Sequence, residues 1–285
     1  MPNTQTADAV NVQMRSIHGL YEIGHAVPVP LRALVRRPSP RLADGLLTHL
    51  DRVPVDVDLA MHQWAAYVDV LRDAGWEVVE VEPADDCPDS VFVEDTVVMY
   101  ADLAVISRPG ADVRRSETPG TETALRELGY RIARIEEPGT LDGGDVLKHS
   151  DTVWVGLGGR TNQAGVDQLA TLLAPLGATV VGVPVTRVLH LKSAVTALPD
   201  GTVVGHEPLV DDPQVWSTFL DVPEPEGGHV VVLDDHSVLM AGSAPKSQEL
   251  YEARRLTCHV VDISEFEKLE GCVTCLSVRL RTDPR

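Results

Sequence analysis

Residues 145–157 read DVLKHSDTVWVGL, two apolar runs on either side of the polar turn His149–Asp151. This pattern is typical of a β-hairpin, because serine and aspartate favour tight turns and the flanking valines favour extended backbone. A helical pattern follows at residues 162–176 and a strand pattern at residues 179–183. The sequence therefore predicts a unit of two strands, a helix and a third strand.

The hairpin pattern recurs along the chain without obvious sequence identity. It is found again at residues 90–106, 195–204 and 230–240. Repeats of about 35–50 residues predict a radial or stacked arrangement in which neighbouring units bury each other's faces. The strand patterns at Ala33–Arg36 and Val273–Arg281 lack a complete unit of their own, so pairing them would close a ring. The expected fold class is α/β, built from repeated strand, strand, helix, strand units.

Length and charge limit the kinds of partner that the protein can have. The chain has 285 residues, 44% of them hydrophobic, and no long Gly/Ser linker or charge run divides it. Residues 29–285 are therefore expected to form a single domain, after an N-terminal extension of poor order at residues 1–28. The net charge of −19 repels nucleic acid and anionic membranes and attracts small cations, although solubility alone explains it equally well.

The sequence carries no pattern typical of a targeting or membrane segment. Its start lacks the basic residues and apolar run of a signal peptide, and about 18 consecutive apolar residues occur nowhere. The four cysteines are too few for a disulfide framework in a chain of this length, which favours a reducing compartment. We therefore expect a cytoplasmic protein.

Cys275 is a candidate nucleophile. It lies in the strand-like run 273–280, just after a loop, where a side chain can project into a central cavity. A cysteine in an apolar strand is most often packed in a core. Its spacing from Cys272 also resembles a redox pair or half of a zinc site, but no second pair occurs and no helix begins there.

His190 is a candidate general acid and base. Leucines flank it on both sides, a setting that is typical of a buried core histidine. Cysteine chemistry on an amine leaving group nevertheless requires a general acid that can then become a base for water, and imidazole titrates in the useful range. Both interpretations are open on the residues alone.

Carboxylates interrupt apolar runs at two places. Asp89, Glu94 and Asp95 cluster before and within the first hairpin pattern, where they must face either solvent or a cavity with partners. Asp142 begins the tetrapeptide DGGD, whose glycines permit either a plain turn or a close approach to a ligand. A thiol, an imidazole and several carboxylates are the parts of a cysteine-nucleophile enzyme that acts on a cationic substrate.

Six motifs in chain order resemble those of the dimethylarginine dimethylaminohydrolase family, from about residue 30 to the C-terminus. They are PDSVFVED at 88–95, SRPG at 107–110 with Arg114 and Arg115, LDGGDVL at 141–147, GRTNQ at 159–163, LHLKS at 189–193 and TCLSV at 274–278. The resemblance implies a five-bladed α/β propeller closed by its N- and C-terminal strands, in agreement with the repeats. It also implies a dimethylargininase.

By this resemblance, Cys275 would attack the guanidinium carbon of an N-methylated arginine and form a covalent thiouronium intermediate. His190 would protonate the departing amine and then activate the water that releases citrulline, while Asp142 orients the imidazole. Asp95 and Glu94 would hold the guanidinium group. Cysteine suits this step because its thiolate is a strong nucleophile and a bound cation lowers the thiol pKa.

The same resemblance assigns the residues that bind the amino-acid end of the substrate. Arg114 and Arg160 would bind the carboxylate, and Asp89 would bind the α-amino group with help from backbone carbonyls near Leu47 and Leu269. The implied partner is a small cationic amino acid, with no cofactor, metal, nucleic acid or membrane. A monomer and a homodimer are both compatible with the sequence.

Other functions fit part of the pattern. An arginine deiminase, or a hydrolase of another guanidine, would use the same groups, but arginine deiminases typically carry an added helical domain for which this chain has no room. An agmatine deiminase would have no use for Arg114 and Arg160, because its substrate has no carboxylate. A non-catalytic propeller that binds an amino acid is the alternative of another class. A zinc protein would need Cys87, Cys258 or His259 beside the Cys272–Cys275 pair.

Overall fold

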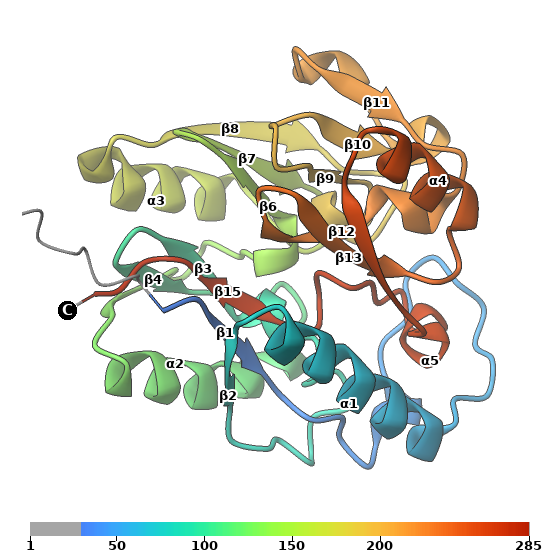
Figure 1. The fold of residues 1–285 in the computed structure, drawn as a ribbon. Coiled ribbons are helices and arrows are strands. Elements are labelled where there is room, and N and C mark those ends of the chain that lie inside the picture. Colours follow the sequence, from blue (N-terminus) through green and yellow to red (C-terminus); the bar gives the residue numbers. More distant parts are fainter. Residues whose placement is uncertain (1–29, 285) are drawn as a thin grey trace, which may run out of the picture.

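Five small sheets of three strands each are arranged in a ring (Figure 1). The computed structural model describes residues 30–284, so the N-terminal extension expected at residues 1–28 lies outside the described residues. In strand order the sheets are β15-β1-β2, β3-β4-β5, β6-β7-β8, β11-β10-β9 and β12-β13-β14. The predicted five-bladed α/β propeller is confirmed.

The strands are short and recur in the predicted order. They are β1 (Arg32–Val35), β2 (Glu77–Glu80), β3 (Val97–Tyr100), β4 (Leu103–Ile106), β5 (Arg131–Arg134), β6 (Val146–His149), β7 (Thr152–Leu157), β8 (Thr179–Pro184), β9 (Val195–Ala197), β10 (Val203–Gly205), β11 (Phe219–Asp221), β12 (Val230–Asp234), β13 (Ser237–Ala241), β14 (Thr257–Val261) and β15 (Val278–Leu280). The α-helices are α1 (Val57–Asp73), α2 (Thr118–Glu127), α3 (Gln163–Leu173), α4 (Pro245–Ala253) and α5 (Ser264–Glu267).

All five sheets share one strand pattern. The middle strand pairs antiparallel with one neighbour and parallel with the other, as in β3-β4-β5 and β6-β7-β8. In the remaining sheet β15 takes the antiparallel place, with Leu280 opposite Arg32 of β1. The predicted closure of the ring by the first and last strands is therefore confirmed.

The hydrophobic core is divided into five clusters, each lying between two neighbouring sheets. Helices fill four of these spaces: α1 and α5, α2, α3 and α4. Their ends follow the sequence, since Asp56 caps the first turn of α1 and Asn162 that of α3. Burial of each helix's apolar face between two sheets fixes the spacing of the units.

The unit β9-β10-β11 differs from the prediction because its connection carries no α-helix. Two short 3-10 turns, Glu207–Leu209 and Pro213–Val215, take its place. Pro213 restricts Asp212 before it to extended backbone, at φ −142° and ψ 93°, and so keeps the two turns from joining into one helix. Trp216 fills the space instead, with its ring 6.5 Å from that of Trp154 and 6.2 Å from that of Phe219.

The antiparallel outer member of each sheet lies toward the middle of the ring. β15 contacts β3, β6 contacts β9, and β9 contacts β12, so these strands from neighbouring units meet one another. The 3-10 turns that precede three of them also pack together, namely η2 (Val93–Thr96), η4 (Gly143–Asp145) and η6 (Leu191–Ser193). The residues just before the inner strands are therefore the ones that converge. Among residues 30–284, no helix is both long and apolar enough to cross a bilayer.

Candidate active site

Asp142 and His190 form a buried pair where η4 meets η6. The distance between Asp142 Oδ2 and His190 Nε2 is 3.0 Å, and both side chains are almost fully buried. The backbone N–H of Gly110 donates to Asp142 Oδ1 at 2.9 Å. Since this bond fixes the carboxylate, the carboxylate in turn fixes the orientation of the imidazole ring.

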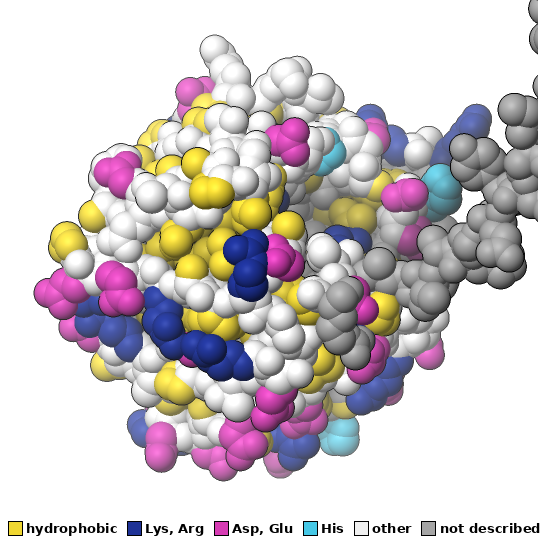
Figure 2. All heavy atoms as spheres, turned by 90° about the vertical axis from the view of Figure 1, so that its left-hand side faces the viewer, with side chains coloured by type: hydrophobic (Ala, Val, Ile, Leu, Met, Phe, Trp, Pro, Cys, Tyr) yellow, Lys and Arg dark blue, Asp and Glu magenta, His cyan; other side chains and the backbone are white. Residues whose placement is uncertain are grey.

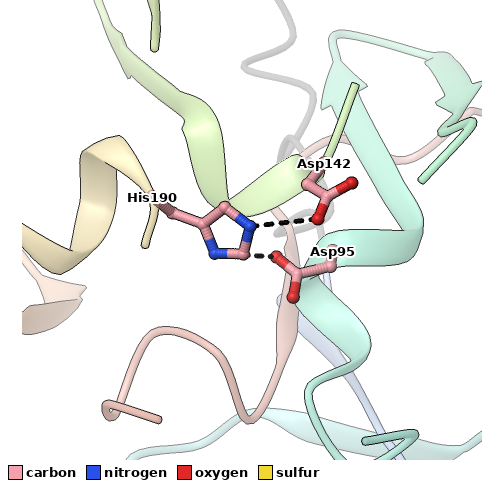
Figure 3. A group of neighbouring side chains, drawn as sticks. All are labelled: Asp95, Asp142 and His190. Carbon is pink, nitrogen blue, oxygen red and sulfur yellow. Dashed lines mark hydrogen bonds and ion pairs between the residues drawn. The ribbon is translucent and has the colours of Figure 1, made fainter. Parts of the chain in front are cut away.

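Asp95 lies next to Asp142 at the same imidazole (Figure 3). Its Oδ1 is 3.7 Å from His190 Nδ1 and accepts a hydrogen bond from the backbone N–H of Gly144 at 2.9 Å. Burial alone would raise the pKa of Asp95, but the charges of His190 and Arg114 outweigh it and lower this pKa to about 2. Asp95 is therefore a carboxylate at neutral pH.

The charge of His190 depends on the carboxylates around it. Burial opposes the imidazolium form, but Asp95, Asp145 and Asp142 outweigh burial and raise the pKa of His190 to about 9. Asp145 also fixes the next turn, because its Oδ1 accepts the N–H of Leu191 at 2.9 Å. At neutral pH the imidazole therefore holds a proton that it can donate.

The two glycines of the DGGD tetrapeptide permit this close packing. A Cβ at Gly144 would lie 2.5 Å from Asp95 Oδ1 and 2.7 Å from His190 Nδ1. A Cβ at Gly143 would lie 2.0 Å from the carbonyl oxygen of Glu94. The tetrapeptide thus contains a 3-10 turn in which the glycines permit close approach between groups of the protein. Close approach to a ligand stays a prediction.

Cys275 lies in a turn at residues 273–276 rather than in the predicted strand, since β15 begins only at Val278. The turn is held by the N–H of Cys275, which donates to the carbonyl of Cys272 at 3.1 Å. Tyr67 of α1 donates its hydroxyl to the carbonyl of Val273 at 2.9 Å. The predicted strand is therefore wrong at this end. The carbonyl of Val273 bonds to the Tyr67 hydroxyl and the N–H of Cys275 bonds within the turn, instead of to a neighbouring strand.

The thiol of Cys275 is buried and contacts a second thiol. Its Sγ is 3.3 Å from Cys272 Sγ, and Thr274 Oγ1 lies 3.2 Å from the latter. The contact with Cys272, together with burial and the charges of Glu94 and Asp95, raises the pKa of Cys275. Without a cation beside it, Cys275 is therefore a neutral thiol.

The two carboxylate oxygens of Glu94, the residue before Asp95, have different partners. Its Oε1 accepts from Lys192 Nζ and from Arg279 Nη2, each at 2.6 Å. Its Oε2 is buried and lacks a hydrogen-bond partner within the described part of the chain. One carboxylate oxygen therefore remains available to a donor.

Asp95, Asp142 and His190 each place one ligand atom within 4.8 Å of the others, which is a set that could hold a metal ion. All three groups already have partners in the protein, including the guanidinium of Arg114 at 2.6 Å from Asp95. A cation is therefore already present beside this carboxylate.

Two curated proteins resemble the chain over almost their whole length. It is 63% identical over 250 residues to the N(G),N(G)-dimethylarginine dimethylaminohydrolase of Streptomyces coelicolor, covering 88% of this chain and 97% of that protein. It is 32% identical over 251 residues to the protein of the same name from Pseudomonas aeruginosa, covering 86% and 98%. The chain belongs to the dimethylarginine dimethylaminohydrolase family. No family model matches it.

Solved structures of this family have the same fold. A crystal structure of the Pseudomonas aeruginosa enzyme, a cysteine-to-serine variant complexed with citrulline, matches with a TM-score of 0.83 at 30% identity, covering 89% of this chain and all of that one. The N-terminal domain of a cyanobacterial arginine dihydrolase, bound to substrate, matches with a TM-score of 0.79 at 20% identity, covering 89% and 98%. At that identity only the fold is shared.

The family resemblance assigned Arg114 and Arg160 to the same task, but the two guanidinium groups differ in their partners. Arg114 is buried and pairs with Asp95 at 2.6 Å and with Glu117 at 2.8 Å, and its Nη2 also reaches the carbonyl of Asp89. Arg160 reaches only the hydroxyl of Thr48, at 3.4 Å, and its Nη1 is a buried donor with no partner among the described residues. The contacts therefore favour Arg160 over Arg114 as a ligand for a free carboxylate.

Asp89 and Arg160 both bind the segment at residues 45–50. The carboxylate of Asp89 accepts the N–H of Leu46 at 3.1 Å. From the other side, Glu270 accepts the backbone N–H groups of Thr48 and Leu50. Burial raises the pKa of Asp89, against the charges of Arg114 and Arg160. The segment therefore occupies the groups that were assigned to the amino-acid end of a ligand.

Leu47 lies within this segment and is half-buried against the hydrophobic cluster that contains the buried Leu269. Leu269 directly precedes Glu270, the residue that binds the segment. Binding of a ligand by backbone carbonyls near these two residues stays a prediction.

Sequence reasoning missed three residues of this site. Glu117 binds Arg114 through both of its oxygens, and its position three residues later on a turn was a signal that could have identified it. Asp145 and Glu270 hold backbone N–H groups. No sequence pattern marks such contacts, because they join segments that are distant in the chain.

Proposed function

We propose that this protein hydrolyses N-methylated arginines to citrulline and the corresponding methylamine. The observation that carries the proposal is His190, which contacts the carboxylates of Asp95 and Asp142, in a chain that belongs to this family. The charge of Asp95 acts on both His190 and Cys275. An imidazolium that acts together with a buried thiol would supply the acid, and then the base, that a two-step hydrolysis needs.

In the first step the Cys275 thiol releases its proton to solvent as the substrate cation binds, and Sγ forms a bond to the guanidinium carbon. The bond from this carbon to the methylated nitrogen then breaks, and His190 gives a proton to the departing amine. In the second step His190 takes a proton from water as the water oxygen bonds to the carbon. Breaking of the S–C bond releases citrulline and restores the thiol.

Binding of the substrate cation favours the first step. Burial and neighbouring negative charge raise the pKa of Cys275, and a guanidinium placed beside it would lower this pKa again. Asp95 and the unpartnered Oε2 of Glu94 are suited to receive guanidinium N–H groups. We propose that Arg114 positions Asp95 for this contact.

Binding of the amino-acid end requires the segment at residues 45–50 to move. In the structure Leu46 occupies Asp89 and Thr48 contacts Arg160, so a substrate ammonium and carboxylate would replace these contacts. Backbone carbonyls near Leu47 and Leu269 would then face the ammonium. Because both ends of the substrate are held, the distance from the guanidinium carbon to Cys275 Sγ is set by binding.

The main alternative is a deiminase that uses the same groups on an unmethylated guanidine. The unpartnered Nη1 of Arg160 favours a substrate that carries a carboxylate, which disfavours agmatine. Arginine is the alternative substrate that these contacts also fit.

All four cysteines are free thiols, which supports a reducing compartment such as the cytoplasm.

The test is citrulline formation from asymmetric dimethylarginine, monomethylarginine and arginine, with agmatine followed as its carbamoyl product. The Cys275→Ser variant is assayed alongside, and Cys87→Ser is a control that removes a buried thiol outside the site. We expect turnover of the methylated substrates, loss of it in Cys275→Ser and retention in Cys87→Ser. Turnover of arginine alone would change the function to a deiminase, and binding without turnover would indicate a ligand-binding propeller.

A further inference from the structure

A cavity of about 330 Å³ lies among the inner strands of the ring. The inner strand of every unit lines it: Val97–Tyr100 of β3, Val146–Lys148 of β6, Thr196–Ala197 of β9, Val230–Val232 of β12 and residues 278–282 of and after β15. Glu94, Gly143, Lys192 and Thr274, which precede these strands, also line it. The cavity therefore extends from the turns of the candidate site along the strands to the turn after Tyr100.

Four basic side chains line this cavity: Lys148, Lys192, Arg279 and Arg281. Glu94 is the single carboxylate among the described residues that line it. Four positive charges therefore face one negative charge, inside a protein whose formal net charge is −19. The excess charge has the opposite sign to that of the protein as a whole.

The basic groups fall into two pairs by the partners that they have. Lys192 and Arg279 share one oxygen of Glu94. Lys148 donates to the carbonyl of Met99, and Arg281 donates to the carbonyl of Val232. The second pair therefore contacts neutral acceptors, and each group keeps N–H donors that are free for a further ligand.

Arg281 is held at the exposed end of the cavity. Its guanidinium lies over the ring of Trp76, 4.9 Å from the centroid, which fixes its position. Asp235 is the acidic side chain that acts on it electrostatically, and Asp235 does not line the cavity. Figure 2 views the molecule from the side at which β15 ends, and most acidic side chains on this face lie toward its edge.

The unbalanced charge affects the ammonium of Lys148. Burial lowers the pKa of Lys148 to about 7, and repulsion from Lys192 and Arg279 adds to this effect, while Glu94 opposes it. Burial and the neighbouring basic groups therefore disfavour the charged form of Lys148. An anion between these groups would reverse the repulsion and restore the proton.

We propose that the cavity binds a small oxyanion with two negative charges, of the phosphate or dicarboxylate type. Guanidinium and ammonium groups on opposite strands provide the charge-assisted hydrogen bonds that recognise such groups. The volume admits either type. Glu94 belongs to both sites, but Asp95, Asp142, His190 and Cys275 are not among the described residues that line the cavity. Anion binding is measured directly, so the test does not depend on the hydrolase function.

The direct test is isothermal titration calorimetry of the full chain at pH 7.5 with inorganic phosphate and, separately, with succinate. Sodium chloride at matched ionic strength controls for screening, and two buffers of different ionisation enthalpy reveal proton uptake. We expect saturable binding of one equivalent with net uptake of protons, and the tighter of the two anions identifies the type. Heats from both oxyanions that match those from chloride would overturn the proposal.

Lys148→Met tests the position, since methionine keeps the length of the side chain and removes its charge. We expect the affinity to fall by about tenfold or more and the proton uptake to disappear. Lys246→Met, on the exposed first turn of α4, is the matched control for the loss of one charge. Equal affinities of the two variants would contradict the proposal. If Lys148→Met does not fold, Arg281→Gln at the mouth is expected to weaken binding to a similar degree.

Discussion

The two ends of the inner strands hold opposite charges. Before the strands begin, carboxylates surround one imidazole, and the site is suited to a cation. Along the strands, basic groups surround a cavity that is suited to an anion. Glu94 lies between them and bonds to Lys192 and Arg279. A ring of short strands can therefore carry two unlike compartments, because side chains before a strand and on it meet different neighbours.

The largest effect is expected from Asp142→Asn, which keeps the shape of the acidic end but removes the charge next to His190. We expect kcat to fall by about 10³ to 10⁴-fold, as for other charge-removing changes beside a catalytic imidazole. The alkaline limb of the kcat profile, expected near pH 9 in the unchanged protein, should move to lower pH. Steady-state rates between pH 6 and 10 would measure both, and an unmoved limb would mean that His190 is not the titrating group.

Glu94→Gln tests the boundary between the two ends. It removes the carboxylate that Lys192 and Arg279 share, leaving two buried cations without their partner. We expect the free energy of unfolding to fall by about 3–5 kcal/mol. Urea unfolding would show this, with the exposed Glu80→Gln as a control. If the free energy of unfolding falls no more than in Glu80→Gln, water rather than Glu94 compensates the charges of Lys192 and Arg279.

Cys272→Ala tests how the acidic end controls the nucleophile. The contact between the two sulfur atoms raises the pKa of Cys275, so its removal should lower this pKa. We expect alkylation of Cys275 by iodoacetamide at pH 7 to become faster by about tenfold, or one unit of pKa. Mass spectrometry of the modified peptide distinguishes the two cysteines. Slower alkylation would show that Cys272 assists ionisation of Cys275 rather than opposing it.

The smallest expected effect is a difference in how stability depends on pH. The pKa of His190 is raised from 6.5 to about 9, so its stabilisation is fully present below pH 6.5 and is lost as the pH rises through 9. The pKa of Lys148 is lowered from 10.5 to about 7, so the native state binds fewer protons and stability rises with pH in that window. Between pH 7 and 9, His190 and Lys148 therefore have opposite effects on how the free energy of unfolding changes with pH.

Replacement of either His190 or Lys148 should leave the pH dependence of the free energy of unfolding that the other residue causes. In Lys148→Met the free energy of unfolding should fall more steeply between pH 7 and 9, by at most about 1.4 kcal/mol per unit from His190. In His190→Gln it should rise instead. Urea unfolding at several pH values would measure both slopes, and parallel curves for all three proteins would contradict the opposition.

The sequence was most predictive where local chemistry decides the structure. The turn at residues 199–201 follows from its residue types, since Gly201 takes a φ of +83°. The capping of α1 and α3 also has local signals. The motifs located Asp142 and His190, which the structure brings to 3.0 Å. The family resemblance therefore selected two side chains that the structure brings into contact.

What could not be predicted depends on contacts between distant segments. Arg114 is committed to Asp95 and Glu117, which no local pattern distinguishes from a free substrate ligand. Cys275 is in a turn because a hydroxyl from α1 takes up the carbonyl of Val273. The basic cavity combines groups from several units, none of which is unusual by itself.

Closure of the ring has a consequence for the order in which the protein acquires its chemistry. Arg32 pairs with Leu280, so the first described strand has no antiparallel neighbour until the last one arrives. Cys275 belongs to the short turn immediately before that last strand. The aspartates and His190 are synthesised before Cys275, and contacts so distant in sequence form late in folding. The candidate nucleophile is therefore placed by the same strand pairing that closes the ring, so a chain without this pairing holds no assembled site.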